Sequence, residues 1–176
     1  MPKHWIASPA RCITAGAFII VNKKYCCAFT GHRNVRGDLD LNALTSVIKN
    51  LIERGVTTFY NGIARGFDLI SAQCVLKLKA DYPQIKLIAC VPCPEQDKYF
   101  SKEDKLTYKK VLDACDEVKI LSTRYHKGCM FLRDRFMVDN SSHLIAYYRG
   151  DEGGTEYTLN YASTFEEEEE IEIYLV

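Results

Sequence analysis

The sequence predicts an α/β fold: a Rossmann-like, doubly wound and mainly parallel sheet between two layers of helices. Short apolar runs typical of buried strands alternate with helix-like stretches along the chain. Glycine-rich turns follow three of these runs, at residues 30–33, 62–68 and 153–156. The length of 176 residues, 47% of them hydrophobic, suffices for one domain with its own core.

The expected strands are short, apolar and bounded by turn residues or charges. In order, they are residues 25–30, 56–60, 85–91, 117–121, 143–148 and 171–176. The expected helices lie between them and show helical spacing of apolar residues or helix-capping residues. They cover residues 41–52, 69–78, 101–115, 130–140 and 154–164.

Helix ends are marked by residues that satisfy free main-chain groups. Asp38 or Asp40 can cap the first helix, and Gly55 stops it. Ser101 and Asp104 resemble a capping box at the start of the third helix. Right-handed crossovers then bring the loops that follow the strands to one edge of the sheet, where ligands bind in such folds.

Composition disfavours several function classes. Lys+Arg and Asp+Glu are balanced at 23 each, so a protein that coats DNA is disfavoured and nucleic acid is an unlikely partner. His4, His126 and His143 share no metal-ligand spacing, and Cys90 and Cys93 lack a second cysteine pair, so no metal is expected. No cofactor is expected either. Eight cysteines, mostly in apolar runs, indicate reduced thiols and a cytoplasmic protein.

The N-terminal segment, residues 1–24, is expected to be an extension, either an extra strand or an arm, before a domain at 25–176. Its apolar run at 15–21 is too short to span a bilayer, which needs about 20 residues. No membrane association is expected.

The turn after the second expected strand carries the densest set of candidate ligand-binding residues. Gly62 and Gly66 allow a tight turn, Arg65 can bind a phosphate, and Asp68 can accept hydrogen bonds from a ribose. Alternatively, Arg65 and Asp68 pair with each other and cap the helix. The spacing alone favours neither interpretation.

Other candidates lie in the remaining turns, and most have a structural alternative. The first turn offers Gly31, His32 and Arg33; a purely structural role for His32 is nearly as plausible as a ligand contact. Arg133 can reach a phosphate or form a salt bridge on the helix surface, and Phe100 can cover a base or pack on the helix that follows it. The third turn is expected to cradle phosphate through Gly153, Gly154 and Thr155.

Two parts of the chain resemble known families. Residues 62–68, Gly-Ile-Ala-Arg-Gly-Phe-Asp, resemble the signature of the DNA-processing protein A (DprA/Smf) Rossmann domain. Arg133, Met137, the strand at 144–148 and Gly154-Thr155 resemble the Lonely Guy (LOG) group. Both groups belong to the SLOG superfamily, and residues 25–162 look most like its stand-alone, YpsA-type branch. The resemblance implies a nucleotide-like small-molecule partner and a homo-oligomer.

Departures from the LOG pattern bear on chemistry. Thr158 stands where the LOG catalytic Glu is expected, which leaves Glu156 and Asp68 as the candidate catalytic carboxylates. The resemblance therefore favours binding of a nucleotide or nucleotide-derived signal, such as an ADP-ribose-like compound, for sensing or sequestration. One alternative is a LOG-like nucleoside-monophosphate phosphoribohydrolase, and a second is a single-stranded nucleic-acid-binding module of the DprA kind.

Overall fold

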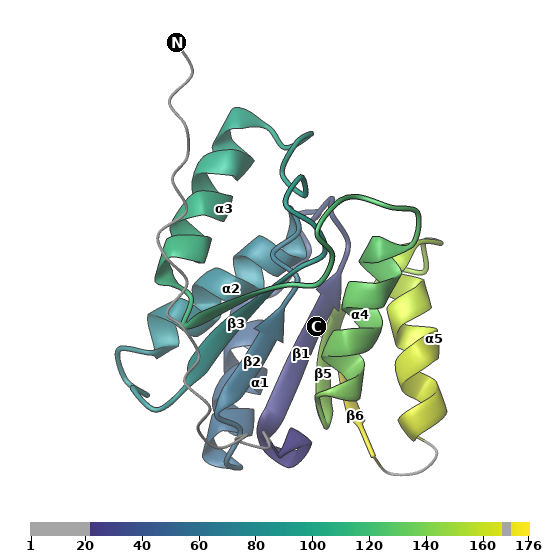
Figure 1. The fold of residues 1–176 in the computed structure, drawn as a ribbon. Coiled ribbons are helices and arrows are strands. Elements are labelled where there is room, and N and C mark those ends of the chain that lie inside the picture. The colour runs from purple at the N-terminus through teal and green to yellow at the C-terminus, as the bar shows by residue number, and fades with distance from the viewer. Residues whose placement is uncertain (1–21, 167–169) are drawn as a thin grey trace, which may run out of the picture.

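A computed structural model describes residues 22–166 and 170–176 as one six-stranded sheet with helices on both faces (Figure 1). The strands are β1 (Cys26–Gly31), β2 (Thr58–Asn61), β3 (Lys86–Val91), β4 (Glu117–Ile120), β5 (His143–Tyr147) and β6 (Glu172–Leu175). Their order is β4-β3-β2-β1-β5-β6, and every pairing is parallel. The expected Rossmann-like, doubly wound α/β fold is confirmed.

Five helices connect the strands. They are α1 (Leu41–Glu53), α2 (Phe67–Leu78), α3 (Lys102–Ala114), α4 (Cys129–Asp139) and α5 (Gly154–Glu166). The first three cover one face of the sheet, and α4 and α5 cover the other (Figure 1). The change of face follows from right-handed connections, because the chain moves outward from β1 to β4 and then returns to place β5 beside β1.

The core has one part on each side of the sheet, and β1 contributes to both. Cys27 and Phe29 point toward α1–α3, while Cys26 and Ala28 point toward α4 and α5. This follows from the two-residue period of a strand. Burial on both faces explains why the first four residues of β1 are apolar, as expected of a central parallel strand.

Two helix caps have well-defined hydrogen bonds. Asp40, rather than Asp38, caps α1, and its Oδ1 accepts main-chain N–H bonds at 2.8 and 3.1 Å. At α3, the Ser101 hydroxyl accepts from the main-chain N–H of Asp104 at 3.0 Å and donates to its carboxylate at 2.9 Å. Ser101 therefore caps α3 as predicted, but the Asp104 carboxylate accepts from the Ser101 hydroxyl and not from its main-chain N–H, so the bond that would complete a capping box differs from the predicted one.

The two edge strands depart from the expectation that all strands are buried on both faces. In β4, Val118 and Ile120 are 44% and 58% exposed, and in β6, Leu175 is 68% exposed. Helices pack mainly over the central strands, so the edge strands keep one open side. Their sequences were apolar enough to predict strands but could not show which strands are central.

Most of the expected N-terminal extension, residues 1–21, lies outside the described residues. The described chain begins with a 3-10 turn, Lys23–Tyr25, that leads directly into β1, so Tyr25 precedes the strand in which it was expected. Within 22–166 and 170–176, no helix is long and apolar enough to cross a membrane.

Candidate functional site

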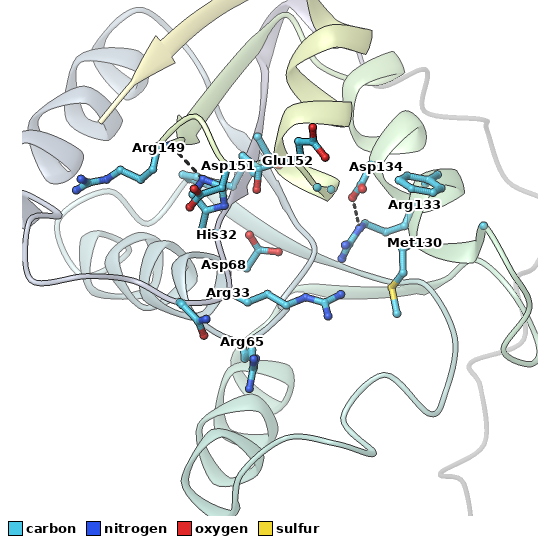
Figure 2. Close-up of a pocket in the computed structure, with 18 of the residues that line it drawn as sticks. His32, Arg33, Arg65, Asp68, Met130, Arg133, Asp134, Arg149, Asp151 and Glu152 are labelled. Atoms are coloured by element: carbon cyan, nitrogen blue, oxygen red, sulfur yellow. Dashed lines mark hydrogen bonds and ion pairs between the residues drawn. The ribbon is translucent and has the colours of Figure 1, made fainter.

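A cavity of about 640 Å³, here called the main cavity, lies at the carboxyl ends of β1 and β5 (Figure 2). These strands are neighbours, but the chain leaves them toward opposite sides of the sheet. Such a divergence opens a crevice between the outgoing loops, and ligands of open α/β sheets bind there. The walls come from the loops after β1, β2 and β5 and from residues 125–134.

The structure brings together residues from all three glycine-rich turns. Eight of the predicted residues line the main cavity: His32, Arg33, Arg65, Asp68, Arg133, Gly153, Gly154 and Thr155. Five others do not line it: Gly31, Gly62, Gly66, Phe100 and Glu156. The predicted convergence of the three turns is therefore observed, although not every predicted side chain reaches the cavity.

The glycines of the first two turns allow protein segments to pack closely on each other. A Cβ at Gly31 would overlap the Phe67 ring, and one at Gly62 would overlap the Arg133 guanidinium. Gly66 has φ +83°, and a Cβ there would overlap the main-chain carbonyl of Arg33. The sequence suggests that these glycines allow close approach by a ligand, but the atoms that approach them are the protein's own.

Arg133 is a buried side chain that connects α4 to the loop after β2. It is 5% exposed, and its Nη1 donates to the Gly62 carbonyl at 2.8 Å. Its Nε donates to the Asp134 carboxylate at 2.6 Å. The alternative of a salt bridge on the helix surface is wrong, because the pair is buried. Burial alone would lower the pKa of Arg133, but Asp134 and Asp68 raise it, so the guanidinium stays charged.

Asp68 is a buried carboxyl at the cavity wall. It is 5% exposed, and its Oδ2 accepts from the main-chain N–H of Ala64 at 3.3 Å. Among the described residues it forms no ion pair with Arg65, contrary to one of the two interpretations. Burial raises the pKa of Asp68 to about 7, with Arg133 opposing the shift and Asp134 adding to it.

The charged groups of the cavity face a common region. Figure 2 shows the Asp68 carboxylate and the guanidinium groups of Arg33 and Arg133 turned toward the same part of the cavity. Arg33 and Arg65 form no ion pair with any described carboxylate. Their positive charges are therefore available to an anion.

Two buried amides outside the predicted site hold the loop after β2. Asn61 is fully buried; its Oδ1 accepts from Ile63 N at 2.7 Å, and its Nδ2 donates to the Asp68 carbonyl at 3.0 Å. Gln96 donates to the Gly62 carbonyl at 2.8 Å. Ile63 has φ +43°, which is costly for a β-branched residue. A polar Asn at the end of an apolar strand was a usable signal, whereas Gln96 gave none.

His32 ties the first turn to the third. Its Nε2 accepts from the main-chain N–H of Arg149 at 3.0 Å, and its ring stacks 5.6 Å from that of Tyr148. The Arg149 guanidinium pairs with Asp38, which also accepts from the Tyr147 hydroxyl. His32 thus has the structural role considered from sequence and also lines the main cavity.

At the third turn, α5 begins at Gly154, beside the cavity. Thr155 is 6% exposed, and the Thr158 hydroxyl donates to the Gly154 carbonyl at 2.8 Å. Thr158, at the position of the LOG catalytic Glu, therefore bonds within its own helix. Glu156 lies against the Tyr148 hydroxyl and outside the cavity lining. The carboxylates that do line the cavity are Asp68, Asp134, Asp151 and Glu152.

Phe100 belongs to the core rather than to the main cavity. It packs edge-to-face on Tyr108 of α3, with ring centroids 5.6 Å apart. A second cavity of about 410 Å³, the side cavity, lies on the other side of Arg33 and Arg65. Its own lining is Ala64, Cys93, Glu95, Gln96, Tyr99 and Phe100, and it shares Arg33, Arg65, Tyr125 and Met130 with the main cavity.

The cysteines of the described chain are free thiols. Cys90 and Cys93 are both buried. Burial raises the pKa of Cys90 to about 12, so this residue is a protonated thiol at neutral pH rather than a reactive thiolate.

Comparison with known proteins identifies the family of this chain. The model of the YpsA family, described as "YspA SLOG family", matches residues 39–176. The chain belongs to the YpsA SLOG family. The SPbeta prophage-derived protein YoqJ of Bacillus subtilis is 34% identical over 132 residues, 68% of this chain and 77% of YoqJ. A UPF0398 protein of Halalkalibacterium halodurans is 31% identical over 137 residues, 76% of this chain and 72% of that protein.

Two solved structures share the fold of this YpsA-family chain. DNA processing protein A of Streptococcus pneumoniae superposes with a TM-score of 0.59 and 18% identity over 87% of this chain. This chain spans 50% of the length of that protein. The corresponding protein of Helicobacter pylori, whose single-stranded DNA binding mode has been described, gives a TM-score of 0.60 and 16% identity, covering 91% of this chain and 68% of that protein.

Proposed function

We propose that the main cavity binds a nucleotide or a nucleotide-derived signal, such as an ADP-ribose-like compound, for sensing or sequestration. The observation that carries the proposal is the meeting of Arg33, Arg65 and the first turn of α5 at one cavity. A guanidinium group can donate two parallel hydrogen bonds to the oxygens of one phosphate. The free main-chain N–H groups at the start of a helix also attract anions. Together they suit a phosphate or diphosphate group.

The remaining features of the cavity suit the rest of such a ligand. Its volume of about 640 Å³ lies in the range of roughly 300–1,000 Å³ typical of small-molecule sites. The Asp68 carboxyl can hydrogen-bond a ribose hydroxyl in either protonation state. Because its pKa is raised to about 7, a large fraction of the molecules carry no charge there that would repel a phosphate.

The proposal is binding rather than hydrolysis. Cleavage of an N-glycosidic bond needs a carboxylate beside the ribose as positive charge develops. Thr158 supplies no carboxylate, and Glu156 lies outside the cavity lining. Asp68, the remaining candidate, does line the cavity, but burial raises its pKa to about 7, so much of it is uncharged at neutral pH and stabilises positive charge poorly. Incubation with adenosine monophosphate is expected to release no adenine. Steady release that Asp68→Asn abolishes would support the phosphoribohydrolase instead.

Arginine variants test the proposed anion site. Arg33→Gln with Arg65→Gln is expected to weaken binding of ADP-ribose about 10- to 100-fold, measured by calorimetry, because charge-assisted hydrogen bonds are lost. Arg135→Gln on α4, which is outside the cavity lining, is the matched control and should change affinity less than about two-fold. Native mass spectrometry of protein purified from cells should show a nucleotide-sized mass increment. Failure of every nucleotide tested to bind the wild type would contradict the proposal.

A second candidate is binding of single-stranded DNA. Two observations favour it: the described DNA binding mode of the H. pylori neighbour, and the exposed rings of Tyr99 and Tyr125 beside Arg33 and Arg65. Aromatic rings next to cations suit successive bases and phosphates. Retention of single-stranded DNA at physiological ionic strength would support this candidate over the first.

Two further expectations are also part of the proposal. The free thiols of the described chain, most of them buried, suit a reducing compartment such as the cytoplasm. Self-association follows from the superfamily resemblance, and light scattering coupled to gel filtration tests it. A mass equal to one chain at all concentrations would contradict it.

A further inference from the structure

Nucleotide binding in the main cavity leaves the side cavity without a role, yet the side cavity opens beside the proposed phosphate site. It has a volume of about 410 Å³, again within the range of roughly 300–1,000 Å³ for small-molecule sites. Arg33 and Arg65 line both cavities, so they stand at the boundary between them. An anion held by these arginines would have open space on both sides.

The linings of the two cavities differ in character. The side cavity has three aromatic side chains, of which Tyr99 is 85% exposed and Tyr125 is 64% exposed. Phe100 is fixed by its contact with Tyr108, so its ring is a preorganised part of the wall. Aromatic side chains also line the main cavity (Phe29 and Phe131, with Tyr125 shared), and the side cavity has polar residues of its own, Glu95 and Gln96. Asp68 and the start of α5 line the main cavity and not the side cavity. Tyr99 and Phe100 therefore offer a planar ring a stacking surface in the side cavity, and Asp68 with the start of α5 suits ribose and phosphate in the main cavity.

We infer that the ligand is a dinucleotide: its linking phosphates lie against Arg33 and Arg65, and the side cavity receives its second planar ring. This inference rests on the proposed function and narrows its ligand class from any nucleotide to a compound with two ring systems.

Two pairs of probes isolate the second ring. NAD⁺ is ADP-ribose with an added nicotinamide ring, and diadenosine diphosphate carries two adenines where adenosine monophosphate carries one. Calorimetry is expected to show each two-ring probe binding roughly 5- to 100-fold more tightly than its one-ring partner, from stacking of the additional ring.

The variant Tyr99→Ala assigns that gain to the side cavity. Tyr99 is highly exposed, so its removal is not expected to disturb folding. The gain for the two-ring probes should disappear in this variant, while the affinity for ADP-ribose stays within about two-fold. Tyr25→Ala, at the opposite end of β1 and 43% exposed, is the matched control and should keep the gain.

The outcomes separate this inference from the function on which it rests. Equal affinity for one-ring and two-ring probes would overturn the inference and leave nucleotide binding intact. A gain in affinity that persists in Tyr99→Ala would also overturn the inference and leave nucleotide binding intact. So would an equal loss of affinity for one-ring and two-ring probes in this variant, because the single ring of a mononucleotide would then occupy the side cavity. No binding of any probe to the wild type would overturn both.

Discussion

At the scale of single residues, the site is built around a buried charge cluster. Asp68, Arg133 and Asp134 are each at most 6% exposed and lie in mutual electrostatic contact. Two carboxyls share one guanidinium, so full ionisation would leave a net negative charge in the interior. Burial, with a smaller contribution from Asp134, raises the pKa of Asp68 to about 7 against the opposing effect of Arg133, so this carboxyl can take up a proton near neutral pH.

Asp68 should make stability depend on pH. Its pKa rises from 3.8 to about 7 on folding, so between about pH 4 and pH 7 the folded state holds a proton that the unfolded state has released. The free energy of unfolding therefore falls as pH rises through this window and levels off above it.

Asp68→Asn removes this dependence. The stability of the variant relative to the wild type, measured by urea unfolding, should increase between about pH 4 and pH 7 by on the order of a few kcal/mol. Asp113→Asn, an exposed change on α3, should run parallel to the wild type. If the unfolding free energy of Asp68→Asn also ran parallel to that of the wild type across this pH range, the raised pKa of Asp68 would be contradicted.

Arg133→Met should be strongly destabilising. It leaves two buried carboxyls without their cation and removes a donor from the Gly62 carbonyl. Loss of one partner from a buried ion pair costs about 3–5 kcal/mol, measurable by urea unfolding. Arg135→Met, one residue from the cluster but exposed, should cost less than about 1 kcal/mol. A similarly small loss of unfolding free energy in both variants would show that Arg133 does not hold α4 against the loop after β2.

At the scale of elements, the loops after β1 and β2 pack against each other before any ligand arrives. Gly66 precedes α2 with φ +83° and faces the carbonyl of Arg33, and Phe67 N donates to the His32 carbonyl at 3.2 Å. Asn61 and Gln96 fix the second loop through its main chain. The turns therefore form a preorganised rim, which reduces the entropy lost on binding.

Gly66→Ala tests this loop packing. The positive φ and the overlap with the Arg33 carbonyl should together cost about 2–4 kcal/mol in urea unfolding. Gly37→Ala provides the control, because a Cβ there meets nothing within 4 Å, and its effect should stay within about 0.5 kcal/mol. If Gly66→Ala were as mild as the control, the two loops would not be in firm contact.

At the scale of the whole molecule, charge is balanced while the cavity is locally basic. The net charge is +0, but Arg33 and Arg65 face the cavity without described carboxylate partners. Long-range attraction to a polyanion is therefore weak, and attraction is confined to one concave site. Such an arrangement suits a small anion better than an extended strand.

This charge distribution predicts a shallow salt dependence. With about two phosphates neutralised, the logarithm of the affinity for single-stranded DNA should fall with the logarithm of salt concentration with a slope of about −1.4. Fluorescence anisotropy should show no retention of a single-stranded oligonucleotide at physiological salt. A steep slope with micromolar affinity there would favour the DNA-binding candidate.

Much of the fold and part of the site followed from the sequence alone. Alternating apolar and amphipathic segments determined the parallel α/β class, because burial on both faces requires continuous apolar strands. The glycine-rich turns marked the loops that meet at the cavity, because consecutive right-handed connections place such loops at one edge. The caps at Asp40 and Ser101 followed from local chemistry.

Tertiary structure decided what each of those residues does. Which strands are central, that Gly31, Gly62 and Gly66 contact protein, and that Arg133 is buried beside Asp134 all depend on segments far apart in sequence. Residue type and spacing record local preference, whereas the pKa of Asp68 and the packing of the loops arise from neighbours that only the folded chain supplies.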